Sequence, residues 1–162
     1  MAKMLKILQV NNEEELKTLR EISKDVTMEE LKSDDFQNFL DDLVFTAKNT
    51  ETEEGYRIAG LAAIQVGVSK RVFCILNDDD EFEILINPEI KVINNKQVIG
   101  LEACLSIPKI QGNVLRSKKI KVTYIDRNGK KMKERFTNWE SREIQHEYDH
   151  LEGVLFTDKS ID

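Results

Sequence analysis

The sequence predicts an α+β fold in which mainly antiparallel strands surround one helix near the carboxyl end. Two helical segments lie near the amino end, β-forming stretches separated by turns fill the middle, and a capped helical segment follows residue 137. Short turns between consecutive strands favour antiparallel pairing. The length of 162 residues fits one compact domain, so we expect residues 1–162 to fold as a single unit.

Two amphipathic helices are expected near the amino end. Asn12 precedes EEELKTLREI, which carries acids in its first turn and leucines at helical spacing. Ser33 precedes DDFQNFLDDLVFTAKN, in which Phe36, Leu40 and Leu43 recur at helical spacing. These apolar stripes are interpreted as core-facing surfaces.

The middle of the chain is interpreted as a series of strands. VFCIL at 72–76 and EFEILINPEIKVI at 81–93 are followed by VIGLEACLSIP, an extended segment expected to end at Pro108. KKIKVTYI and KKMKERF then flank a turn that contains Asn128-Gly129, which predicts a hairpin. Thr137 to Glu140 matches a capping box, so a helix should begin there and stop at Gly153.

Composition and charge exclude several classes of protein. No apolar run is long enough for a membrane helix, and the opening MAKMLKILQV lacks a signal-peptide pattern, so we expect a cytoplasmic protein without membrane contact. The net charge of −6 argues against nucleic-acid binding as the main task. Residues 116–135 are locally basic, and a solvated hairpin is favoured there over a polyanion-binding patch.

The strongest chemical signal is His146-Glu147-Tyr148-Asp149-His150, an H-E-x-x-H motif within the last helix. Two histidines four residues apart reach one ion from the same helix face, and Glu147 suits a carboxylate that moves protons at a bound water. Two such histidines are also compatible with ordinary surface or core positions. The metal interpretation is favoured because the chain has no other histidine.

A third ligand is expected upstream of the motif. The twelve residues after His150 contain no histidine, and the soft donors of the chain are Cys74 and Cys104. Cys74 lies inside VFCIL and is interpreted as a core residue. Cys104 lies at the end of a strand, where a thiolate can face a cleft. Two imidazoles and one thiolate leave an open position, as in catalytic metal sites.

Three segments together resemble the signatures of the peptide deformylases, in their order and spacing. They are IAGLAAIQ at 58–65, EACLS at 102–106 and QHEYDHL at 145–151. The similarity covers roughly residues 33–158 and implies a peptide-deformylase-like fold. It also implies removal of the N-formyl group from the formyl-methionine of nascent peptides, with release of formate.

The resemblance implies a set of metal and catalytic residues. The ligands of one divalent ion would be Cys104, His146 and His150. Ferrous iron (Fe2+) is expected, and Zn2+ or Ni2+ are able to occupy the same ligands. Glu147 would be the general base and then the general acid. The side-chain amide of Gln65 and the backbone N–H of Leu105 would stabilise the oxyanion.

The resemblance also implies how the substrate is held and how the ligands are supported. The peptide would pair along the edge of Ile58, Ala59 and Gly60, with its methionine in an apolar pocket. Ala103 would also border the substrate. The supporting residues would be an ion pair of Glu102 and Arg116, with Arg142 in the approach to the helix. For Gln145 and Asp149, orientation of ligands and ordinary helix-surface hydrogen bonding are equally compatible.

Some positions depart from the family pattern. Ile58 and Ala103 replace usual glycines, and Gln111 replaces a usual arginine. If φ is positive at 58 or 103 the backbone is strained, and if it is negative the change falls on pocket shape. An active deformylase is favoured over a peptide-binding domain of low turnover, and an H-E-x-x-H endopeptidase is the weakest alternative. We expect a monomer that meets nascent chains in transient proximity to the ribosome, without the long carboxy-terminal docking helix of some bacterial members.

Overall fold

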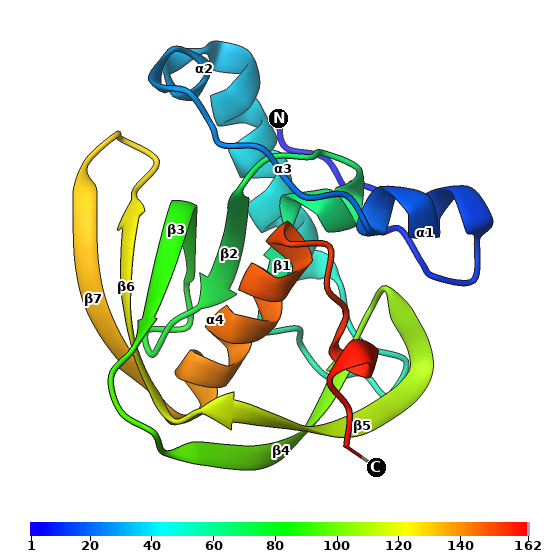
Figure 1. Ribbon diagram of the computed structural model, residues 1–162. Helices are drawn as coiled ribbons and strands as arrows, with labels where there is room; N and C mark the ends of the chain where they lie inside the picture. Colours follow the sequence, from blue (N-terminus) through cyan, green and yellow to red (C-terminus); the bar gives the residue numbers. More distant parts are fainter. Residues whose placement is uncertain (162) are drawn as a thin grey trace.

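A computed structural model describes residues 1–161 of the chain (Figure 1). The helices are α1 (Glu13–Leu19), α2 (Met28–Lys32), α3 (Asp34–Asn49) and α4 (Asn138–Leu151). The strands are β1 (Gly60–Ala62), β2 (Val72–Leu76), β3 (Phe82–Val92), β4 (Gln97–Cys104), β5 (Ile107–Ser117), β6 (Lys119–Ile125) and β7 (Lys131–Thr137). Two short 3-10 helices are η1 (Ala63–Val66) and η2 (Phe156–Asp158).

All strand pairs are antiparallel, and they form two sheets around α4. One sheet has the order β1-β2-β3-β6-β7, and β4 pairs with β5 in a separate ribbon. In Figure 1 the helix α4 crosses the middle of the molecule, with β3, β6 and β7 of the larger sheet to its left and the ribbon below it. The predicted α+β class with a central helix is therefore confirmed.

The two long helices pack on opposite faces of the larger sheet. Leu40 and Leu43 of α3 belong to a core cluster with Val72 and Ile86 of the sheet. A second cluster joins α4 to the other face and includes Ile144. Alternation along the strands divides the side chains between these two clusters. The motif helix is thus fixed between two layers, which limits the movement of its side chains.

The predicted starts of the helices are correct. Asn12 accepts hydrogen bonds from the N–H groups of Glu14 and Glu15, and Ser33 accepts one from the N–H of Phe36. Helix α4 begins where expected, but the predicted capping box is wrong, because the side chain of Thr137 makes no cap hydrogen bond. The start of α4 is instead tied to the ribbon, where the Ser141 hydroxyl donates to the carbonyl of Ser117.

The extended segment that was expected to end at Pro108 is divided in two. Strand β4 ends at Cys104, Leu105 and Ser106 form a turn, and β5 runs on from Ile107. Proline is compatible with the start of β5 because, among residues 1–161, β4 is the only strand that pairs with it. The pairing register shifts between Ala103 and Cys104, so the thiol lies where the ribbon bends.

The predicted hairpin is confirmed: β6 and β7 pair along their length and Gly129 adopts a positive φ of 87° in the turn. Gly153 has a φ of 71° just after α4, as expected for a glycine that ends a helix. Within residues 1–161, no helix combines the length and the apolar character required to cross a bilayer.

Candidate metal centre and active site

Three candidate ligands from two distant segments meet at one point. The ligand atoms of Cys104, His146 and His150 lie within 4.8 Å of one another. Cys104 Sγ is 3.4 Å from His150 Nε2, and the two imidazole centroids are 5.1 Å apart. Both histidines are buried in α4 and the thiol comes from the bend of the ribbon. This donor set fits a divalent metal ion with three protein ligands.

The two cysteines differ in environment. Cys74 is fully buried in β2, and its burial, with a contribution from Glu147, raises the pKa of the thiol far above its ordinary value. Burial also raises the pKa of Cys104, but His150 and His146 bring it down to about 5. A thiolate is the form that binds a metal. The structure therefore brings Cys104 and not Cys74 to the candidate ligands.

Glu147 lies beside the cluster with part of its carboxylate unsatisfied. The residue is buried and its Oε1 has no hydrogen-bond partner within the described chain. Burial raises its pKa well above the ordinary value, and Glu143 one helical turn earlier adds to this. A Cβ on Gly60 would lie 2.8 Å from Glu143 Oε1 and 2.9 Å from Glu147 Oε2. A Cβ at position 60 would therefore displace one or both carboxylates from their present positions.

The amide of Gln65 points at the candidate thiolate. Its Oε1 accepts a hydrogen bond of 3.0 Å from the N–H of Ala62, which fixes the orientation of the amide. Its Nε2 then donates to Ser106 Oγ at 3.1 Å and approaches Cys104 Sγ at 3.4 Å. A buried, fixed N–H donor next to the ligand atoms is suited to stabilising a developing negative charge.

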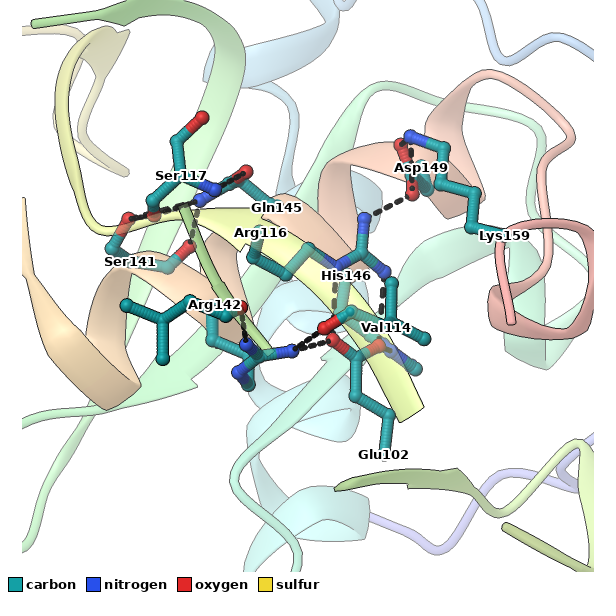
Figure 2. A network of polar contacts seen from close by, with 11 residues as sticks. Glu102, Val114, Arg116, Ser117, Ser141, Arg142, Gln145, His146, Asp149 and Lys159 are labelled. Atoms are coloured by element: carbon teal, nitrogen blue, oxygen red, sulfur yellow. Dashed lines mark hydrogen bonds and ion pairs between the residues drawn. The ribbon is translucent and has the colours of Figure 1, made fainter. Parts of the chain in front are cut away.

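Glu102 is the centre of a buried polar network that ends on a ligand (Figure 2). Its carboxylate accepts bonds of 2.9 Å from both Nε and Nη2 of Arg116, and one of 2.7 Å from Arg142 Nη1. It also lies 2.9 Å from Nδ1 of His146. Burial would raise the pKa of Glu102, but Arg116 and His146 hold it well below its usual range. The network orients His146 so that Nε2 is available to an ion.

Asp149 and Gln145 of α4 bond to different partners. Arg116 Nη1 donates to Asp149 Oδ2 at 2.6 Å, so Asp149 supports the network indirectly, through Arg116 (Figure 2). Gln145 instead bonds the backbone of Ser117 through both its oxygen and its nitrogen. Helix-to-ribbon bonding is therefore the interpretation of Gln145 that the structure supports.

A cavity of about 690 Å³ opens in front of the cluster. Its lining includes Cys104, His146, Glu147 and Gln65, and the expected substrate neighbours Ile58, Ala59, Gly60, Ala103 and Leu105. Neither Ile58 nor Ala103 is among the residues with positive φ, so their side chains alter the shape of the cavity and do not strain the backbone. Strand β1 begins only at Gly60, and Ile58 is packed into the core.

The comparisons with known proteins agree with this geometry. The family model described as polypeptide deformylase matches residues 4–162. The chain belongs to the peptide deformylase family. A peptide deformylase of Fusobacterium nucleatum is 38% identical over 141 residues, which are 87% of this chain and 77% of that protein. Members of this family are metal-dependent hydrolases that remove the N-formyl group from the methionine of nascent peptides.

Other deformylases match to different extents. One from Pseudothermotoga lettingae is 46% identical over 99 residues, which span 61% of this chain and only 57% of that relative. The crystal structure of the Thermotoga maritima peptide deformylase superposes with a TM-score of 0.84 at 32% identity and 99% coverage of both chains. A Met-Ala-Ser-bound class I type b deformylase from Acinetobacter baumannii gives a TM-score of 0.84 at 30% identity, covering 98% of this chain and 99% of that one.

Two residues at the deformylase site, Glu143 and Ser106, were not predicted from the sequence. Glu143 lies one turn before Glu147 on the same helix face, and the four-residue spacing was the available signal. Ser106 is fully buried and accepts the hydrogen bond from Gln65. It lies within the EACLS segment, but nothing in the sequence distinguishes a serine that binds a side chain from one that only forms a turn.

Proposed function

We propose that this chain hydrolyses the N-formyl group of formyl-methionyl peptides at the cavity in front of Cys104. The observation that carries the proposal is the meeting of three ligand atoms from β4 and α4 beside a buried, partly unsatisfied carboxylate. Membership of the deformylase family supports the reaction class.

Cys104, His146 and His150 would hold one divalent ion, and we propose Fe2+, with Zn2+ or Ni2+ as substitutes. When bound, the ion supplies Lewis acidity that makes water nucleophilic near neutral pH. A cysteine thiolate and two imidazoles are soft and borderline donors that suit these metals better than Mg2+ or Ca2+. The buried network behind His146 fixes one ligand before any metal is present.

Glu147 is proposed as the proton carrier. Its carboxylate accepts the proton from the attacking water and then donates it to the amine that leaves the formyl carbon. Burial and Glu143 raise the pKa of Glu147 above the ordinary carboxyl value, which is the direction required of a group that both accepts and donates a proton. The oxygen without a partner, Oε1, is the atom available for this transfer.

The oxyanion that forms on the formyl group would accept hydrogen bonds from Gln65 Nε2 and from the N–H of Leu105. Each such donor contributes about 3 to 4 kcal/mol to transition-state stabilisation in comparable hydrolases. Gln65 is held in place by Ala62 and Ser106, so the donor needs no rearrangement during the reaction.

We propose that the peptide pairs with the outer edge of the larger sheet. Strand β1 is the first strand of that sheet and has β2 as its only strand partner among the described residues. Its other edge is therefore open to an extended chain. Ile58, Ala59 and Gly60 would border the substrate on this side and Ala103 on the ribbon side. The methionine side chain would lie against the apolar part of this lining.

The test is formate release from formyl-Met-Ala-Ser by anaerobically iron-loaded protein, beside the Glu147→Gln variant and an N-acetylated peptide. We expect turnover that the variant loses by a factor of about 10² to 10⁴, with metal content unchanged and no internal cleavage. Peptide binding without formate would support the binding-domain alternative. Cleavage of internal peptide bonds would support the endopeptidase. Either result would overturn the proposal.

Three further expectations belong to this proposal. We infer that residues 1–162 act as one deformylase-like metallohydrolase domain, because both sheets contribute to the same cavity. We also propose that the chain works as a monomer in the cytoplasm, near ribosomes where formylated chains emerge. Sedimentation of the metal-loaded protein and its localisation in cells test these points.

A further inference from the structure

Positively charged side chains are concentrated on one face of the larger sheet. Ile120, Val122 and Tyr124 of β6 point into the core, so the alternate residues of β6 point to the opposite face, away from α4. Their partners on β3 and β7 share that face. The cations on it are Lys91, Lys119, Lys121, Lys131, Lys133 and Arg135. We call these six residues the cationic face; Glu89 is the carboxylate that accompanies them.

The cations on this face lie directly opposite one another. Lys91 of β3 pairs with Lys121 of β6, and Lys121 pairs in turn with Arg135 of β7. Lys133 is the diagonal neighbour of Lys121, because it pairs with Thr123. Like charges in direct cross-strand pairs destabilise a sheet. Their proximity is also visible in the pKa of Lys121, which is lowered mainly by Lys133 and further by Lys91 and Arg135.

The cationic face is not neutralised from within the molecule. Among residues 1–161, none of its six members forms an ion pair. The chain has seven arginines, and Arg135 is the one that has no carboxylate partner in the described structure. The chain carries 30 acids against 24 cations, so a quarter of its cations are gathered here beside one acid. A stability cost of this kind indicates a partner that supplies negative charge.

The chemistry of the face selects the kind of partner. It presents no aromatic ring on which unpaired bases could stack. Its apolar side chains form no continuous stripe for insertion into a bilayer: Ile125 is packed against the core, and Ile93, which is 36% exposed, lies by itself beside Lys119 just after the end of β3. We propose that the cationic face binds the phosphate backbone of double-helical nucleic acid, without regard to base sequence. Contacts of this kind need only lysine and arginine at the correct spacing.

The length of the cationic face and the acidic character of the rest of the molecule support a nucleic-acid duplex as the partner. From Lys119 to Ile125 the face extends about 20 Å at roughly 3.4 Å per residue, which places several cations along neighbouring phosphates of one duplex. The rest of the molecule is acidic, so a polyanion would repel the other surfaces and orient this face toward itself. The sequence alone favoured a solvated hairpin; the addition of Lys91 from β3 is what the structure contributes.

The test uses fluorescence anisotropy with a labelled duplex RNA of about 20 base pairs, spanning two helical turns. The variant is Lys121→Gln/Lys133→Gln/Arg135→Gln. The matched control, Lys17→Gln/Lys32→Gln/Lys48→Gln, removes the same charge from exposed helix positions. Thermal unfolding verifies that each variant folds, and the relief of repulsion should leave the face variant at least as stable as the parent.

We expect the parent chain to bind at low salt and the face variant to bind at least about tenfold more weakly, with its log K against log salt slope smaller by about three. The control should keep most of the affinity. Three results would each overturn the proposal: no binding by the parent, equal losses in both variants, or binding of single-stranded RNA as tightly as the duplex. Binding only to phosphatidylglycerol vesicles would overturn it as well. Formate release should be unchanged in both variants, so this proposal and the proposed function fail separately.

Discussion

Replacement of Glu102 by glutamine removes one buried negative charge while keeping the size of the side chain. In the native chain this carboxylate faces two guanidinium groups and one imidazole at 2.7 to 2.9 Å. The Arg116 side chain is only 3% exposed in the native chain. In the variant it would remain a buried cation with a single acidic partner, Asp149. An amide at position 102 would also direct N–H groups at these donors.

The magnitude follows from the cost of breaking a buried pair, which is about 3 to 5 kcal/mol. Because Asp149 remains bound to Arg116, we expect about 3 kcal/mol for Glu102→Gln. For a chain of this size, each kcal/mol lowers Tm by roughly 2 to 4 °C, so Tm should fall by about 6 to 12 °C. Metal affinity should fall by about 10- to 100-fold, because His146 loses the group that orients it.

Two measurements check this prediction: thermal unfolding of the metal-free protein, and metal affinity by competition with a chelator. Glu21→Gln is the control, because Glu21 is an exposed carboxylate without an ion pair within residues 1–161. It should change neither quantity. If Glu102→Gln kept both the Tm and the affinity of the parent, the reasoning that this network supports the metal centre would be refuted.

Three further predictions follow from other contacts. Gly60→Ala should lower kcat about 100-fold with normal folding, because the new Cβ displaces the carboxylate of Glu147; unchanged kcat would contradict this. Gly153→Ala should lower the free energy of unfolding by at least about 1 kcal/mol, since φ is 71° and the Cβ would lie 2.4 Å from the Arg20 carbonyl; denaturant unfolding measures it. Arg20→Gln should lower Tm at neutral pH, because the Arg20 side chain lowers the pKa of Asp158. The difference in Tm between the parent and the variant should shrink as Asp158 becomes protonated below about pH 4. A difference in Tm that did not change with pH would exclude this link between Asp158 protonation and stability.

The sequence predicted the parts of the fold that depend on local signals. Helix starts followed from Asn12 and Ser33, and the hairpin from Asn128-Gly129, because caps and tight turns are determined by a few neighbouring residues. The division of 98–108 into β4, a turn and β5 was missed, because an apolar run gives no signal for a reversal that depends on long-range pairing. The capping box at Thr137 failed for a similar reason: tertiary contacts with Ser117 secure the start of α4.

At the site, too, residues with a local sequence signal were predicted, and residues whose role depends on long-range pairing were missed. The spacing of His146 and His150 was readable because both lie on one helix, and the shortage of other donors directed attention to Cys104. Glu143 was not identified, since its role depends on Gly60 lying against both carboxylates. The cationic face was underestimated, because Lys91 joins it only through pairing of β3 with β6, which are separated by β4 and β5 in the chain.

The claim that Cys104 completes the metal centre is tested most directly by the absorption spectrum of the Co2+-loaded protein. A thiolate ligand gives a charge-transfer band in the near ultraviolet, whereas imidazole ligands alone do not. We predict the band in the parent chain and in Cys74→Ala, and its loss in Cys104→Ala. A band that survived in Cys104→Ala, or that disappeared in Cys74→Ala, would contradict the account.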